Sequence, residues 1–405
     1  MDRDLLTTRP GRAAAVAIGV LVLVTAIAIA VLYPSGGERD VRGPAVTATE
    51  AAKVTSVRRG GCEQYAGPNC RVAAMRLEAG PNRGETSFIT LGTDRFSPPI
   101  APGDAIRVAR NLPAGIDEEL GGQLDISDPA AQPYAFVDFE RRAPLLWLIG
   151  AFAVLVVVLA RRQGARALLA LLASLVLVVA FVVPAILAGR SPVLVALAGG
   201  LGVMILTTVI TYGTGVKSQA AMLGTTVSLL VIAGLAALAV KAAQITGFAS
   251  EEALLLQGYG EQELSLQGLV LAGVVIGALG VLDDVTVSQA STVLALRRAN
   301  PLYGLRKLFG EALAVGRDHL GATVNTLVLA YVGASLPTLL IFSTNGVGIS
   351  EGLNREPVAT QVVAMLVGSI GLVLAVPVTT ALAAWLARLV PDAALPAGDG
   401  HGHHH

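Results

Sequence analysis

From Gly268 to Leu296 the chain reads GLVLAGVVIGALGVLDDVTVSQASTVLAL, a run that is long and apolar enough to cross a bilayer. Inside it stand two adjacent acids, Asp283 and Asp284, and Arg297 closes the run 13 residues after Asp284. At about 1.5 Å of rise per residue, the acids lie roughly 20 Å from that charged end. A carboxylate at such a depth costs at least about 2.5–3.5 kcal/mol, so we expect it to face a protein interior, a water-filled cavity or an ion path.

The composition of the whole chain is that of a membrane protein. Its 405 residues are 54% hydrophobic and only 14% charged, whereas soluble domains have about 25% charged residues. The formal net charge is zero and aromatic residues make up 4%. Nucleic-acid binding is therefore not expected, since it requires a basic surface and often stacking aromatics. We predict a polytopic α-helical membrane protein in contact with the lipid bilayer.

About eight spans account for the apolar blocks. The first is read as an uncleaved anchor because its apolar run exceeds the 7–15 residues of a signal peptide. The predicted domains are an anchor over residues 1–33, an outer domain over 34–143, a seven-span domain over 144–390 and a tail over 391–405, which is either native or derived from an affinity tag. The predicted spans are 13–32, 145–160, 167–187, 193–212, 220–240, 268–296, 320–342 and 358–389.

Basic residues predict the orientation of these spans. With a cytoplasmic N-terminus, the inner segments carry many more arginines and lysines than the short outer loops, as the positive-inside rule requires. Both termini are then cytoplasmic. The predominance of Ala, Val, Leu, Gly and Arg is typical of high-GC bacterial genomes, so we expect the plasma membrane of a bacterium. The inner basic residues are Arg161, Arg162, Arg166, Lys217, Arg297, Arg298, Arg306, Lys307 and Arg317; the short outer loops hold Arg190 and Arg355, with Lys241 at a span end.

The segment over residues 34–143 has the pattern of a small β-barrel or sandwich. Short runs rich in Val, Thr and Ile are separated by Gly, Pro and Asn. Cys62 and Cys70 flank a Gly-Pro-Asn turn and favour a disulfide hairpin in an oxidising compartment; a metal pair is the alternative, although the segment contains no His. The strand-like runs are TEAAKVTSV, CRVAAMRLEA, TSFITLG and AIRVARN.

Residues 300–317, between the sixth and seventh spans, have leucines and a phenylalanine at helical spacing with basic residues between them. Such a pattern predicts an amphipathic helix on the cytoplasmic membrane surface. An ordinary connector is the alternative.

Asp284 lies on a stripe of small and hydroxyl residues in the sixth span. Steps of three and four along the helix lead from it to three glycines on one side and to Ser288 and Ser291 on the other. Small residues at this spacing let a second helix approach closely, so we expect Asp284 to face a neighbouring helix or a cleft. Asp283 points about 100° away, to a less polar side. The glycines expected to pack against a helix are Gly273, Gly277 and Gly280.

Polar side chains of other spans could complete a path through the membrane. Asn325 is the most informative because a buried amide needs several partners. Thr326 stands beside it, and Thr207 and Thr211 lie on the cytoplasmic half of the fourth span. Alternatively, these hydroxyls bond the backbone of their own helices.

An intramembrane carboxylate without a basic partner must bind a proton or a cation. No Lys or Arg stands at the depth of Asp283 and Asp284. A group that binds and releases protons is what a coupled transporter requires. The alternative is a structural Asp that ties helices together through hydroxyl groups.

Two blocks of the chain resemble the YibE/F family of bacterial membrane proteins. They are GALGVLDDVTVSQAS, Gly277 to Ser291, and GRDHLGATVNTLVLAYVGASLP, Gly316 to Pro337. The resemblance covers most of the chain and implies an N-terminal anchor, an outer β-rich segment and a multi-span region. In that family a single Asp typically stands at the place of Asp284, with Ser at the place of Ser288; Asp283 is a departure. The resemblance implies no settled activity.

A weaker resemblance is to RND exporters and SecD/SecF. Their spans carry acids in a pattern similar to Gly280–Asp284 and prolines similar to Pro301 and Pro337. In those proteins the acids relay protons. The present chain lacks their duplicated half and has a small outer domain, so the likeness bears on proton coupling only as an analogy.

These observations predict a proton-coupled transporter of a small solute or ion, with Asp284 as the coupling acid and Asp283 in a secondary role. The alternative is a membrane scaffold or assembly factor whose outer domain binds a protein partner, with or without homo-oligomerisation. The chain has no nucleotide-binding loop, nucleophile motif or metal-ligand cluster, so no enzyme activity, cofactor or metal is expected.

Overall fold

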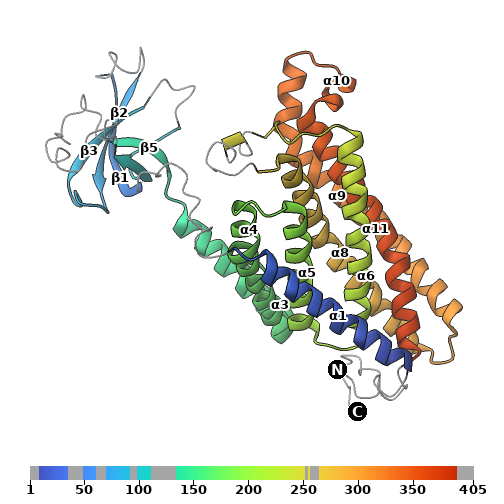
Figure 1. Ribbon diagram of the computed structural model, residues 1–405. Helices are drawn as coiled ribbons and strands as arrows, with labels where there is room; N and C mark the ends of the chain where they lie inside the picture. Colours follow the sequence, from blue (N-terminus) through green and yellow to red (C-terminus); the bar gives the residue numbers. More distant parts are fainter. Residues whose placement is uncertain are drawn as a thin grey trace. The chain divides into compact units, whose positions relative to one another are not determined.

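The computed structural model describes residues 9–34, 49–60, 70–91, 98–110, 134–250, 254–255 and 264–389. The chain forms two compact units, one over Gly43–Val156 and one over Met1–Arg42 with Val157–His405. The first contains a small antiparallel sheet and the beginning of a long helix, and the second is a bundle of long apolar helices (Figure 1). The predicted fold class is thereby confirmed.

The described residues of the sheet unit form five strands in the order β3-β2-β1-β4-β5, all antiparallel. The long strand β1 pairs through Thr49–Lys53 with β4 and through Ala52–Arg59 with β2. The two edge strands β3 and β5 also contact each other, so the sheet curls on itself. The bounds are β1 Thr49–Arg59, β2 Arg71–Leu77, β3 Thr86–Leu91, β4 Ala105–Arg110 and β5 Tyr134–Phe139.

Alternating side chains of these strands form the core of the sheet unit. In β2, for example, Ala73, Met75 and Leu77 are buried while Arg76 is exposed, because successive side chains of a strand point to opposite faces. The four predicted strand-like runs contain β2, β3 and β4 and most of β1, which continues to Arg59. Cys70 is buried and disulfide-bonded; its predicted partner Cys62 lies outside the described residues.

The helical elements are long, as a membrane bundle requires. The principal ones are α1 Arg9–Leu32, α3 Arg142–Leu177, α5 Pro192–Tyr212, α6 Val216–Ala242, α8 Leu266–Ala299, α9 Leu305–Thr344 and α11 Glu356–Ala387 (Figure 1). Short elements are the π-helical η4 Val178–Val182, α4 Val183–Leu187 and α10 Ile349–Asn354.

Seven described helices are long and apolar enough to cross a membrane, against the eight predicted spans. The difference arises from one helical stretch, Arg142–Leu187, which has 46 residues. Its backbone is non-helical at Arg161, where φ is 50° and ψ is −128°. The stretches on either side, 142–160 and 162–187, are each long enough for a crossing of about 20 residues. The break falls where the arginine-rich loop between the second and third spans was predicted.

Most of the predicted amphipathic segment over residues 300–317 is helical in the structure. From Leu305 onward it forms the first turns of α9, which continues without interruption into the seventh span. No proline stands between Leu305 and Leu336 to end the helix. Its buried residues Leu308, Ala312 and Gly316 follow one another at helical spacing, and Leu308 and Ala312 pack in the core of the bundle. The position of this segment at the cytoplasmic membrane surface stays a prediction.

Helices α6, α8 and α11 pack tightly against one another in the bundle. Glycines allow this approach: a Cβ atom added to Gly224 would overlap Thr379, and one added to Gly371 would overlap Ile232. Polar contacts add to the packing. The hydroxyls of Thr225 and Thr286 lie 2.7 Å apart between α6 and α8.

Gln289 links three helices. Its buried side-chain amide on α8 donates to the Ala312 carbonyl of α9 and to the Thr380 hydroxyl of α11, each at 2.8 Å. The amide thus satisfies its donors where water is absent. This contact and the packing around it hold α8 in a defined rotation, which determines where its two acids point.

Candidate functional site

Asp283 and Asp284 stand at the middle of α8, a helix of 34 residues. Asp283 is half-buried and Asp284 is exposed. This reverses the expectation that Asp284 faces the protein and Asp283 the less polar side. The face of α8 that contains Leu282, Val285 and Gln289 is buried, and this packing turns Asp283 inward.

Asp283 lies against α5. The Thr207 hydroxyl is 3.4 Å from Asp283 Oδ2 and also 3.0 Å from the Met204 carbonyl, to which it can donate instead. The second carboxylate oxygen, Oδ1, is buried and has no hydrogen-bond partner in the described part of the chain. No basic side chain among the described residues forms an ion pair with Asp283 either.

A cavity of about 490 Å³ adjoins this carboxylate. Its walls come from α3, η4, α5 and α8, all within the helical unit. Most of the lining is apolar, and the polar side chains are few: Ser174, Thr207, Thr211, Tyr212 and Asp283. The apolar lining includes Ala167, Ala170, Leu171, Leu175, Val178, Val182, Val203, Met204, Ile276 and Leu279.

A π-helical segment forms part of the cavity wall. Val178 and Val182, the two ends of η4, both line it. Pro184 follows in α4 and has no backbone N–H to donate to the preceding turn. Wider turns of this kind are frequent at functional sites.

The predicted polar residues divide into two groups. Thr207, Thr211 and Asp283 line the cavity together, although they come from helices far apart in sequence. The others do not line it. Asp284, Ser288, Asn325 and Thr326 are exposed, and Ser291 is half-buried with its hydroxyl donating to the Val287 carbonyl at 2.7 Å.

The glycine stripe of α8 is open in the described part of the chain. A Cβ atom added to Gly273 or Gly280 would have no neighbour within 4 Å, and one added to Gly277 would meet only Tyr331 Oη, at 3.4 Å. The expected close helix packing on this stripe is therefore not observed. The opposite face of α8 packs on α6 and α11 instead.

Sequence reasoning did not identify Ser174 and Tyr212 as cavity residues. Ser174 donates to the Ala170 carbonyl at 2.8 Å, and Tyr212 receives the Lys217 ammonium over its ring at 4.1 Å from the centroid. A lone serine in a leucine-rich span and a tyrosine at a span end are common in membrane helices. Nothing in the sequence therefore distinguishes Ser174 and Tyr212 from the serines and tyrosines common in such helices.

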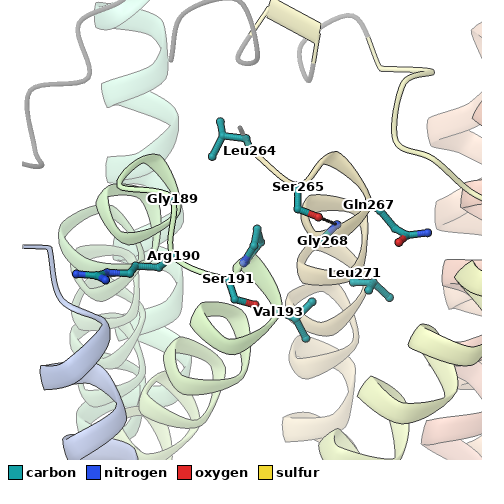
Figure 2. A pocket seen from close by; sticks show the side chains of 10 residues that line it. Gly189, Arg190, Ser191, Val193, Leu264, Ser265, Gln267, Gly268 and Leu271 are labelled. Atoms are coloured by element: carbon teal, nitrogen blue, oxygen red, sulfur yellow. Dashed lines mark hydrogen bonds between the residues drawn. The ribbon is translucent and has the colours of Figure 1, made fainter. Parts of the chain in front are cut away.

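A smaller pocket of about 280 Å³ lies between the turn that precedes α5 and the start of α8. Ser265 caps α8 there by accepting from the Gly268 amide at 3.0 Å. Figure 2 shows the Arg190 side chain directed away from Ser265 and Gly268. Among the described residues, Arg190 is the one charged side chain in the lining of this pocket.

Comparison with known proteins places the helical region in a family. The family model described as YibE/F-like protein matches residues 148–389, which include the cavity and both acids of α8. No curated protein and no solved structure matches the chain.

Proposed function

The chain belongs to the YibE/F-like family, and on this premise we propose that it is a proton-coupled membrane transporter of a small solute or ion in which Asp283 is the coupling acid. The observation that carries the proposal is the position of Asp283 Oδ1. This oxygen is buried, has no partner in the described residues and belongs to a side chain that borders the cavity. A carboxylate placed in this way at the middle of a membrane helix needs a proton or a cation to balance its charge.

The hydroxyl groups beside Asp283 can accommodate both the gain and the loss of a proton at its carboxylate. Thr207 can donate to the ionised Asp283 or to the Met204 carbonyl. When the acid takes up a proton, the hydroxyl retains a partner on its own helix. Thr211 adds a second hydroxyl to the same cavity. In this proposal Asp284, exposed on another side of α8, has no part in coupling.

We place the protein in the plasma membrane of a bacterium, with both termini in the cytoplasm. The excess of basic residues in the inner segments supports this orientation. The sheet unit is then outside the cytoplasm. The disulfide of Cys70 supports that location, because disulfides persist in oxidising compartments.

A scaffold is the second candidate. On the sheet, Lys53 of β1 lies directly opposite Arg76 of β2, and both are exposed. Like charges in this position repel each other, and an acidic partner would relieve the repulsion. Under this alternative, the outer unit binds a protein and the acids of α8 serve only the packing of the bundle.

Proton flux in vesicles separates the two candidates. The full chain is reconstituted in liposomes that contain a pH-sensitive dye and are made acidic inside, and Na⁺, K⁺, Mg²⁺, inorganic phosphate and the organic monocation tetraethylammonium are offered in turn. A transporter should discharge the pH gradient with one of these probes. Asp283→Asn should abolish the discharge, whereas Asp284→Asn, the matched control one residue away, should retain it.

The scaffold candidate predicts a different result. No probe would then discharge the gradient, and Asp283→Asn would leave the protein indistinguishable from the wild type in the flux assay. Discharge that survives Asp283→Asn but is lost in Asp284→Asn would refute the assignment of the coupling acid and restore the one expected from the sequence.

A further inference from the structure

The cavity beside Asp283 has the size and lining of a site for an organic molecule. Its volume of about 490 Å³ lies within the range of roughly 300–1,000 Å³ that is common for small-molecule sites. Alanine, leucine and valine side chains of α3 and η4 form one wall, and Ile276 and Leu279 of α8 form part of another. The ligand must therefore be apolar over most of its surface.

An inorganic ion alone does not match this lining. Divalent cations such as Ca²⁺ and Mg²⁺ take six or more oxygen ligands. The cavity offers one carboxylate and four hydroxyl groups, and the Ser174 hydroxyl among them already donates to the Ala170 carbonyl. The apolar walls would leave most of the coordination shell of such an ion unsatisfied.

The charge of the cavity defines the rest of the ligand. Asp283 is the one ionisable carboxylate in the lining, and its Oδ1 is buried without a hydrogen bond in the described residues. The nearby cation Lys217 lies over the Tyr212 ring, 4.1 Å from its centroid, and is not part of the lining. A positive group inside the cavity would thus supply the charge that Asp283 lacks.

We propose that this cavity binds an organic monocation, with the apolar body of the ligand against α3 and η4 and its charged group at Asp283. The apolar walls and the carboxylate of Asp283 each exclude a different class of ligand. The apolar walls do not suit a hydrated inorganic cation, and the carboxylate repels an anion of the same shape. The inference rests on the proposed transport function, because it names the class of solute that would be moved.

Direct binding tests this proposal. The full chain is embedded in lipid nanodiscs, and binding of tetraphenylphosphonium is measured by equilibrium dialysis, with empty nanodiscs subtracted. Tetraphenylborate, an anion of the same shape, and triphenylphosphine oxide, a neutral analogue, are the ligand controls. Saturable binding is expected for the cation and should be weaker by about tenfold or more for the other two.

Two variants locate the site. Asp283→Asn should weaken binding of the cation by about tenfold or more because it removes the buried charge partner, while Asp284→Asn should bind as the wild type does. Gly280→Leu fills the cavity from α8, where a new Cβ atom has no neighbour within 4 Å. It should fold normally, as judged by a monodisperse elution profile, and lose binding.

Three results would overturn the inference: binding of tetraphenylborate or of the neutral analogue as tight as that of the cation, unchanged affinity in Asp283→Asn, or unchanged affinity in Gly280→Leu. The flux assay, which offers tetraethylammonium beside the inorganic probes, is independent of this one. Flux without cation binding refutes only the ligand class, whereas cation binding in a chain that moves no protons refutes only the transport.

Discussion

At the scale of the residue, the two acids of α8 show how much a rotation of 100° decides. Asp283 and Asp284 have the same chemistry and the same depth, yet one borders a cavity and the other is exposed. Their neighbours in sequence favoured Asp284 for the inner side, because small and hydroxyl residues share its face of the helix. The contacts of Gln289 with Ala312 and Thr380 belong to the packing that orients α8 and leaves Asp283 on the inner side.

A titration is predicted for a pair of residues outside the membrane spans. The pKa of Asp138 lies below its ordinary value of 3.8, chiefly because the Arg141 side chain donates to its carboxylate and secondly because the Phe139 amide does so. Since the pKa is lowered by folding, the ionised form stabilises the folded state above pH 3.8, and this contribution is lost as the pH falls through the lowered pKa.

Arg141→Met should therefore raise the pKa of Asp138 toward 3.8 but not fully to it, because the Phe139 amide remains. Carboxyl carbon chemical shifts of aspartate-labelled protein would report the change. Arg142→Met is the control, since Arg142 is placed against Glu140 at 3.7 Å. An unaltered Asp138 pKa in Arg141→Met would contradict the assignment.

At the scale of the element, the association of α6, α8 and α11 depends on glycines that remove side-chain volume. Two glycines that both lie inside apolar helices differ in the space around them. Gly371 of α11 lies against Ile232 of α6, whereas Gly273 of α8 has open space where a Cβ atom would be. GxxxG-like spacing identifies glycines that can permit the close approach of a second helix. It does not show which of these glycines actually contact one.

Gly371→Val is expected to destabilise the bundle by about 1–3 kcal/mol, because the added side chain overpacks the contact with Ile232. Gly273→Val should cost much less, since nothing obstructs it. Both changes introduce the same residue into a helix, so their helix propensities cancel. Thermal unfolding in detergent, followed by helical circular dichroism, measures the difference; equal midpoints would show that the Gly371 contact is not tight.

At the scale of the whole molecule, the chain combines two units of different chemistry. The sheet unit surrounds its own core of alternating side chains, and the helical unit exposes large apolar surfaces on α1 and α3. Exposed leucines and valines over whole helices are typical of contact with lipid rather than with water. The hydropathy and the alternation of the sequence predicted this division.

The proposed orientation in the membrane predicts the accessibility of two loop positions. Leu302, between α8 and α9, is 93% exposed, and Ile349, after α9, is 85% exposed. Ile349→Cys should react with a membrane-impermeant maleimide in intact cells, whereas Leu302→Cys should react only after permeabilisation. The opposite pattern would invert the topology and place both termini outside.

The sequence by itself determined the fold class, the approximate spans, four of the strands and the presence of intramembrane acids. These features depend on hydropathy, on the period of a strand or helix and on the cost of a charge in lipid, all of which are local or additive along the chain. Only the tertiary structure decided that Asp283 rather than Asp284 borders the cavity, that Thr207 and Thr211 join it while Asn325 does not, and that the glycine stripe is open. The reason is that the rotation of each helix follows from side-chain packing with helices distant in sequence, and no local pattern contains that information.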